Sequence, residues 1–233
     1  MPPSSESDDS VRGVLALSAP VGLAFIPLGT ALGLLVVHAG LAWWWAPVFA
    51  AVIYAGSLEF LMVHLAATAA PLATVALTTF VVNSRHVFYA LSFPLHRVRG
   101  VPAKLYSTYT LSDEAYAVAA GPRARSWTTR AILSMQLCFH LLWVIGATLG
   151  GLLGQALPIE RLTGLDFALT ALFIVLGIDA YRQRPDRITA ATAVVCAAAA
   201  WLVVPGQLLV TAFTAFTGAL LARMLLRRRT QDG

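Results

Sequence analysis

The sequence predicts an all-α, polytopic transmembrane helix bundle of about seven spans, with one re-entrant or broken helical segment near 105–120. Of its 233 residues, 58% are hydrophobic and only 12% are charged, and the mean hydropathy is +0.76. A soluble domain carries about twice that share of charged residues. Glu59 is also the only charged residue between Arg12 and Arg85. Long stretches with so little charge are typical of membrane-spanning segments.

The predicted spans are apolar stretches of about 20 residues, which form helices in lipid because a helix satisfies its own backbone hydrogen bonds. The first span is interrupted by Pro20 and Pro27. In order, the spans cover residues 11–37, 43–68, 72–95, 127–154, 163–181, 188–204 and 206–226. We interpret residues 1–10 as a disordered polar tail, 11–226 as a single integral membrane domain and 227–233 as a basic cytoplasmic tail.

Residues 105–120 are amphipathic and too short to span comfortably. They carry Asp113 and Glu114, so we expect a re-entrant or broken helix that faces the protein interior. Ser112 and the two acids also fit the cap and first turn of a helix, and this purely structural interpretation stays open beside a functional one.

Small residues recur at Gly146, Gly150 and Gly154 within the span 127–154. This GxxxGxxxG pattern predicts a face on which another helix packs closely.

Basic residues near the span ends predict the orientation. They gather within 97–130, within 182–187 and at the C-terminus. All three regions can be cytoplasmic if 105–120 re-enters. The parity of the spans then places the N-terminus outside, unless the proline-containing first segment is itself a hairpin. The basic excess is explained by cytoplasmic loops, so we expect no nucleic-acid partner.

Arg85 is the most informative charged residue, because a guanidinium keeps its proton even inside a membrane segment. Placing it there costs about 2.5 to 3.5 kcal/mol on insertion scales unless partners or water receive it. Helical spacing sets Arg85 next to Tyr89, and Asn83 next to His86, which gives the span 72–95 a polar stripe.

Glu59 is the natural partner for Arg85, because a carboxylate inside a span must pair with a cation or accept a proton. Gly56 and Ser57, just before it, would allow close helix approach or a local opening of the backbone. The pair could instead be purely structural and only fix helix register.

Motifs of other function classes do not occur in the sequence. The five histidines are scattered without metal-ligand spacing, so we expect no metal site and no cofactor. The only lysine, Lys104, follows no glycine-rich phosphate-binding loop, and neither GxSxG nor HExxH occurs. We therefore expect a transporter, not an enzyme, driven by an ion gradient or by the gradient of its own substrate.

Four stretches match one known family in its order and spacing. They are IYAGSLEF (53–60), NSRHVFYALS (83–92), YTLSDEAYAV (109–118) and LDFALTALF (165–173). With them the chain resembles the AzlC family, the large subunits of bacterial branched-chain amino acid exporters. Many members have a glutamine at the position of Glu59 and a proline at that of Thr170.

The resemblance implies a multi-pass protein of the bacterial inner (cytoplasmic) membrane that exports leucine, isoleucine and valine, with methionine as a further candidate. It also implies a small AzlD-like membrane subunit as partner. A zwitterionic substrate needs a cationic site for its carboxylate and an acceptor site for its ammonium. The expected substrate-binding residues are Arg85, Asn83, Glu59, Tyr89, His86 and Ser57, and those for proton or ion coupling are Glu59, Asp113 and Glu114.

Two alternatives belong to other classes. The chain could be a structural membrane subunit whose polar residues only hold helices together. It could also be a membrane-embedded enzyme that uses Glu59, His86 and Asp113 for acid–base chemistry.

Overall fold

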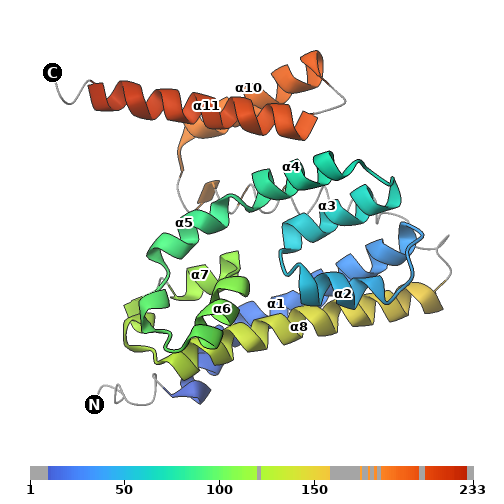
Figure 1. Cartoon of the computed structure of the whole chain (residues 1–233), viewed down its shortest axis with the longest axis vertical. Helices are drawn as coiled ribbons and strands as arrows, with labels where there is room; N and C mark the ends of the chain where they lie inside the picture. The colour runs from blue at the N-terminus through green and yellow to red at the C-terminus, as the bar shows by residue number, and fades with distance from the viewer. Residues whose placement is uncertain are drawn as a thin grey trace. The chain divides into compact units, whose positions relative to one another are not determined.

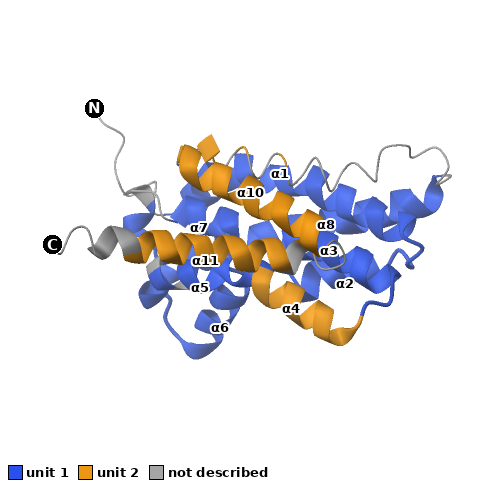
Figure 2. Cartoon of the chain, turned by 90° about the horizontal axis from the view of Figure 1, so that it is seen from above, with its two compact units in different colours: residues 1–70, 82–169 blue, residues 71–81, 170–233 orange. Residues whose placement is uncertain are grey.

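The computed structural model describes residues 10–119, 122–157, 185–204 and 208–229, together with residues 174, 178, 181 and 182. Every regular element among these residues is helical (Figure 1), which confirms the predicted all-α class. The chain separates into two compact units (Figure 2): unit 1 comprises residues 1–70 and 82–169, and unit 2 comprises residues 71–81 and 170–233. The polar residues that the sequence singles out lie in unit 1.

Helix α1, Val11–His38, is continuous through both of its prolines. It begins at Ser10, whose side chain accepts a hydrogen bond from the Gly13 N–H at 3.1 Å. Pro20 and Pro27 lie on exposed positions, outside the buried stripe of the helix. Prolines are tolerated in long apolar helices when the remaining hydrogen bonds and neighbouring helices hold the backbone. The alternative of a hairpin in this segment is therefore wrong.

Helix α8, Thr129–Ala156, packs along α1 through small residues. A Cβ at Gly29 of α1 would lie 2.8 Å from the Trp143 carbonyl oxygen, and one at Gly146 of α8 would lie 2.6 Å from the Ile26 carbonyl oxygen. The two backbones thus touch where side chains are missing, which confirms the predicted packing face. Among the described helices, α1 and α8 are the two that are long and apolar enough to cross a membrane.

The two long helices run parallel, because their contacts advance in the same direction along both. Gly29 meets Gly146, and further on Val37 meets Gly154. If both helices cross the membrane, their N-terminal ends lie on one side, and the chain between them crosses an odd number of times. The predicted two full spans between them would make α1 and α8 antiparallel, so the seven-span topology is not confirmed.

The predicted second span, 43–68, is two helices instead of one. Helix α2 covers Trp45–Val52 and α3 covers Gly56–Ala67. Between them Tyr54 has φ +46°, in the left-handed region that residues other than glycine rarely adopt. The residues at the break are apolar, so hydropathy alone does not reveal it. At 1.5 Å per residue, neither helix spans about 30 Å of hydrocarbon by itself.

The predicted third span, 72–95, is also interrupted. Helix α4, Leu72–Asn83, and helix α5, Arg85–Ser92, are separated at Ser84, and a 3₁₀ turn, η1, follows at Leu95–Arg97. Arg85 therefore occupies the first position of a helix. The boundary between the two units falls within α4.

Residues 105–120 form a broken helix, as predicted. Helix α6 covers Val101–Tyr109, α7 covers Asp113–Ala119, and a 3₁₀ turn, η2, follows at Pro122–Ser126. The Ser112 hydroxyl accepts a hydrogen bond from the Ala115 N–H at 3.2 Å, so the predicted cap is present. The fully buried Gln136 of α8 donates to the Ser107 carbonyl at 2.8 Å, which satisfies a backbone acceptor at the end of α6.

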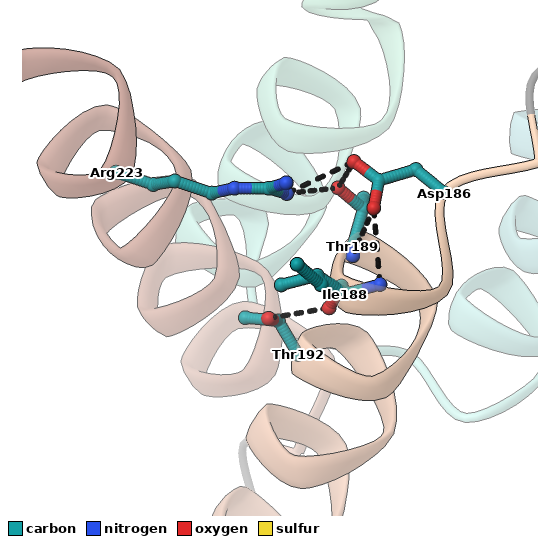
Figure 3. A network of polar contacts seen from close by, with 5 residues as sticks. All are labelled: Asp186, Ile188, Thr189, Thr192 and Arg223. Carbon is teal, nitrogen blue, oxygen red and sulfur yellow. Dashed lines mark hydrogen bonds and ion pairs between the residues drawn. The ribbon is translucent and has the colours of Figure 1, made fainter. Parts of the chain in front are cut away.

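In unit 2, helices α10, Arg187–Val203, and α11, Leu208–Arg229, match the last two predicted spans. Asp186 caps α10 by accepting a hydrogen bond from the Ile188 N–H at 3.0 Å (Figure 3). It also forms an ion pair with Arg223 of α11, with Nη1 2.9 Å from Oδ2. The predicted span 163–181 lies almost entirely outside the described residues. Helix α11 continues to Arg229, so the described part of the predicted basic tail is helical.

Candidate functional site

The break before α3 creates a helix N-terminus inside unit 1. The first residues of α3 are Gly56 and Ser57, and the Ser57 side chain is 8% exposed. The first turn of a helix presents backbone N–H groups that its own carbonyls do not satisfy, and it carries a partial positive charge. The site therefore begins with a feature that favours an anionic group.

Arg85 joins this helix start to α7. Its Nη2 donates to the Ser57 hydroxyl oxygen at 2.7 Å and lies 3.0 Å from Asp113 Oδ2. The three residues lie in the first turns of α3, α5 and α7, so residues from three segments of the chain meet at one guanidinium. The Arg85 and Asp113 side chains keep 37% and 33% of their surface exposed. The pair is thus accessible, and both of its ends can exchange partners.

Glu59 does not pair with Arg85, and that prediction is wrong. Its carboxylate is fully buried; Oε1 accepts the Ala55 N–H at 2.7 Å, and the Trp143 indole N–H reaches both oxygens, at 3.1 and 3.0 Å. The acid partner of Arg85 is Asp113 instead. Residues 59 and 143 are far apart in sequence, so no local pattern could have indicated Trp143.

Three buried atoms around Arg85 have unused hydrogen-bonding capacity within the described residues. Arg85 Nε is an unused donor, and Asp113 Oδ1 and Asn83 Oδ1 are unused acceptors. One unused donor and two unused acceptors suit a small ligand that carries both an acid and an amine.

Aromatic rings lie beside the polar residues. Tyr89 of α5 stacks on Tyr116 of α7 with ring centroids 4.6 Å apart, and the His86 ring meets Tyr89 edge-on at 5.6 Å. His86 Nδ1 donates to the Asn83 carbonyl at 3.1 Å. The predicted residues Asn83, His86 and Tyr89 are thus in one cluster, whereas Tyr116 was not predicted. Glu114 follows Asp113 in the first turn of α7 and is partly buried.

A second polar cluster surrounds His140 of α8. The Tyr106 hydroxyl lies 3.3 Å from His140 Nδ1, and the rings of Tyr54 and Tyr109 lie 4.5 and 5.9 Å from the imidazole. His140 has no predicted role, because a single histidine in an apolar helix forms no recognisable sequence pattern. Among the described residues, no group of three or more His, Cys, Asp or Glu side chains is placed to hold a metal ion.

Comparison with known proteins gives consistent matches along the chain. The family model described as AzlC protein matches residues 20–157. The branched-chain amino acid transport protein AzlC of Bacillus subtilis is 30% identical over 213 residues, covering 90% of this chain and 83% of that protein. An uncharacterized membrane protein of Helicobacter pylori J99 is 31% identical, covering 76% and 79% of the two chains. Inner membrane protein YgaZ of Escherichia coli K12 is 26% identical, covering 72% and 71%.

No solved structure matches the chain significantly.

Proposed function

Because the chain belongs to the AzlC family of membrane proteins, we propose that it is the large subunit of a bacterial inner-membrane transporter that exports branched-chain amino acids. The relative from Bacillus subtilis, named for branched-chain amino acid transport, supports the substrate class. Leucine, isoleucine and valine are the proposed substrates, with methionine as a further candidate.

The observation that carries the proposal is the accessible ion pair between Arg85 and Asp113 at the start of α3. The substrate's carboxylate binds Arg85, using the free Nε–H and the helix N-terminus beside Ser57. Its ammonium binds Asp113 Oδ1 and Asn83 Oδ1. A zwitterion replaces each member of the pair by a group of the same charge, so no uncompensated charge remains in the membrane.

The rest of the cluster serves side-chain contact and coupling. Tyr89 and Tyr116 offer ring surface to a branched apolar side chain. Asp113 and Glu114 are the proposed groups for proton or ion coupling, because a proton on Asp113 would weaken its hold on Arg85. The energy source is an ion gradient or the substrate's own gradient, and the proposed partner is a small AzlD-like membrane subunit.

The test is efflux of labelled leucine or valine from preloaded cells that lack their own exporters, with and without the candidate small subunit. Arg85→Ala should abolish efflux while the protein still inserts in the membrane. Arg125→Ala is the matched control, because Arg125 is exposed on η2. Normal efflux in Arg85→Ala would overturn the site, and no efflux by the native protein with its partner would overturn the function.

A further inference from the structure

We infer that Glu59 and Trp143 are positioning residues, whose hydrogen bonds fix the start of α3 and so place Ser57 against Arg85. The inference rests on the proposed function, in which Arg85 holds the substrate's carboxylate. It gives Glu59 a different role from the substrate or proton binding that the sequence suggested.

The first step is the backbone break itself. Tyr54 has a left-handed φ of +46°, so the backbone leaves the helical path after α2. Ala55 is 8% exposed, and its N–H is therefore a buried donor that needs an acceptor from outside the helix backbone. Glu59 reaches back over the first turn of α3 and accepts it at 2.7 Å. Leaving a buried N–H unpaired is unfavourable, so this contact holds the break in its observed shape.

The second step connects the break to the rigid pair of long helices. Trp143 is 4% exposed and packs edge-on against Phe25 of α1 at 5.7 Å. Its indole N–H holds Glu59, and a Cβ at Gly56 would lie only 3.4 Å from its ring. The first residue of α3 therefore rests on an indole that α1 and α8 fix in place.

The third step leads from the helix start to the site. Ser57 lies between Gly56, where an added Cβ would contact the indole, and Glu59, which accepts a hydrogen bond from the indole N–H. The Ser57 hydroxyl is one of two groups that receive Arg85 Nη2, at 2.7 Å. A shift of α3 would move this acceptor, and a misplacement of about 1 Å can cost about 100-fold in activity.

Replacing Glu59 by glutamine or by leucine separates its role in positioning α3 from the effect of its negative charge. Among the described residues, the Glu59 carboxylate accepts hydrogen bonds from the Ala55 N–H and from the Trp143 indole N–H, and Oε1 receives both. Glutamine keeps an oxygen at the Oε1 position, where both donors bind, and replaces Oε2, the second oxygen that the indole reaches, by an amide NH2; leucine keeps no acceptor. Positioning therefore needs an acceptor at residue 59 but no negative charge.

The first measurement is transport by purified protein with its partner in liposomes, at several leucine concentrations and pH values. Glu59→Gln should stay within about twofold of the native rate with the native pH profile, whereas Glu59→Leu and Trp143→Phe should raise the apparent KM about tenfold or more. Trp127→Phe is the matched control, because its buried indole N–H has no hydrogen-bond partner within the described residues. It should behave as the native protein does.

A second measurement needs no transport. Phenylglyoxal modification of Arg85, quantified by mass spectrometry against the exposed Arg125, should be faster in Glu59→Leu and Trp143→Phe than in the native protein, Glu59→Gln and Trp127→Phe. Modification of Arg85 should also be faster in Ser57→Ala. Adding Trp143→Phe to Ser57→Ala should increase the rate little further, because both substitutions act through the contact between Ser57 and Arg85.

The inference is overturned if Glu59→Gln loses transport as Glu59→Leu does, because an acceptor oxygen at residue 59 would then not be enough for positioning. It is also overturned if modification of Arg85 is unchanged in Glu59→Leu and Trp143→Phe. Gel filtration before each assay shows whether a variant is folded. If Glu59→Leu does not fold, Glu59→Gln still provides a decisive test. Failure of the native protein to move leucine would overturn the proposed function alone, because the Arg85 modification still tests the positioning.

Discussion

At the residue scale, the main question is whether Arg85 serves a ligand or only Asp113. Both side chains are about one-third exposed, and each keeps a buried polar atom without a partner among the described residues. A purely structural pair would gain from complete mutual satisfaction, because a half-satisfied buried network is costly. The unused atoms therefore favour a third participant.

Exchanging the two charges tests this. The double variant Arg85→Asp with Asp113→Arg should keep an ion pair, and with it folding, but should lose leucine efflux, because the carboxylate site is no longer on α5. Labelled leucine efflux and gel filtration in detergent are the two measurements. Efflux restored to the native rate in the double variant would show that only the pairing matters.

An apolar pair tests the structural-subunit alternative. Arg85→Met with Asp113→Leu removes both charges together, so neither is left unpaired. We expect a folded protein without efflux. Full activity of the complex would favour a subunit whose polar residues only hold helices together.

At the element scale, the packing of α1 on α8 depends on missing side chains. Gly29→Ala places a Cβ 2.8 Å from the Trp143 carbonyl oxygen, which cannot move aside as a side chain can. We expect a loss of about 1–3 kcal/mol in unfolding free energy, the usual cost of overpacking. Thermal unfolding in detergent measures it.

Gly218→Ala is the control for that variant. A Cβ at Gly218 in α11 meets nothing within 4 Å, so the substitution should stabilise the helix by about 0.5–1 kcal/mol through its higher propensity. Equal effects of the two variants would contradict close packing at Gly29.

The contact between α10 and α11 depends on pH in a defined direction. The Thr189 hydroxyl, and after it the Arg223 guanidinium and the Thr189 backbone N–H, hold the pKa of Asp186 well below its ordinary value (Figure 3). The folded state thus binds this proton less readily than the unfolded state. The stabilisation is complete above pH ~4, the ordinary Asp value, and is lost as the pH falls through the lower folded value.

Hydrogen exchange tests this contact. Asp186→Ala should speed exchange at the Ile188 and Thr189 amides, which both donate to the carboxylate. Between about pH 5 and pH 8, the protection of these two amides from exchange in the native protein, corrected for intrinsic exchange rates, should be constant. Thr192→Ala is the control, because the Thr192 hydroxyl donates to the Ile188 carbonyl and not to Asp186 (Figure 3). Equal exchange in Asp186→Ala and Thr192→Ala would contradict the role of Asp186.

At the scale of the whole molecule, the parallel direction of α1 and α8 changes the expected orientation. The basic segment 97–130 precedes α8, and cytoplasmic segments are those rich in arginine. If both long helices span, the start of α1 lies on the same, cytoplasmic side. The N-terminus would then be cytoplasmic, not outside as span counting predicts, and the chain between α1 and α8 would cross an odd number of times.

Cysteine labelling in intact cells tests the orientation. With Cys138 and Cys196 replaced by serine, single cysteines at Ser5→Cys and Arg99→Cys should both resist a membrane-impermeant maleimide until the membrane is opened. Labelling of Ser5→Cys alone in intact cells would place the two sites on opposite sides and contradict the parallel crossing of α1 and α8.

Features that depend on local chemistry could be predicted from the amino-acid sequence alone. Low charge and apolar stretches predicted a helical membrane protein; the GxxxGxxxG pattern predicted the face that meets α1; and Ser112 predicted a helix start. Arg85 also stood out without any structure, because a permanent charge in an apolar segment needs a partner. Each of these signals lies within one turn, or a few turns, of a helix.

Which distant residues contact one another could be seen only in the folded chain. Arg85 pairs with Asp113, and Glu59 accepts a hydrogen bond from Trp143. The segment 43–68 is interrupted at Tyr54, and α1 runs parallel to α8. Hydropathy cannot detect a backbone break among apolar residues, and a buried acid can be satisfied by an indole as well as by a guanidinium. The choice between such partners depends on which helices approach one another, and that is a property of the packed molecule.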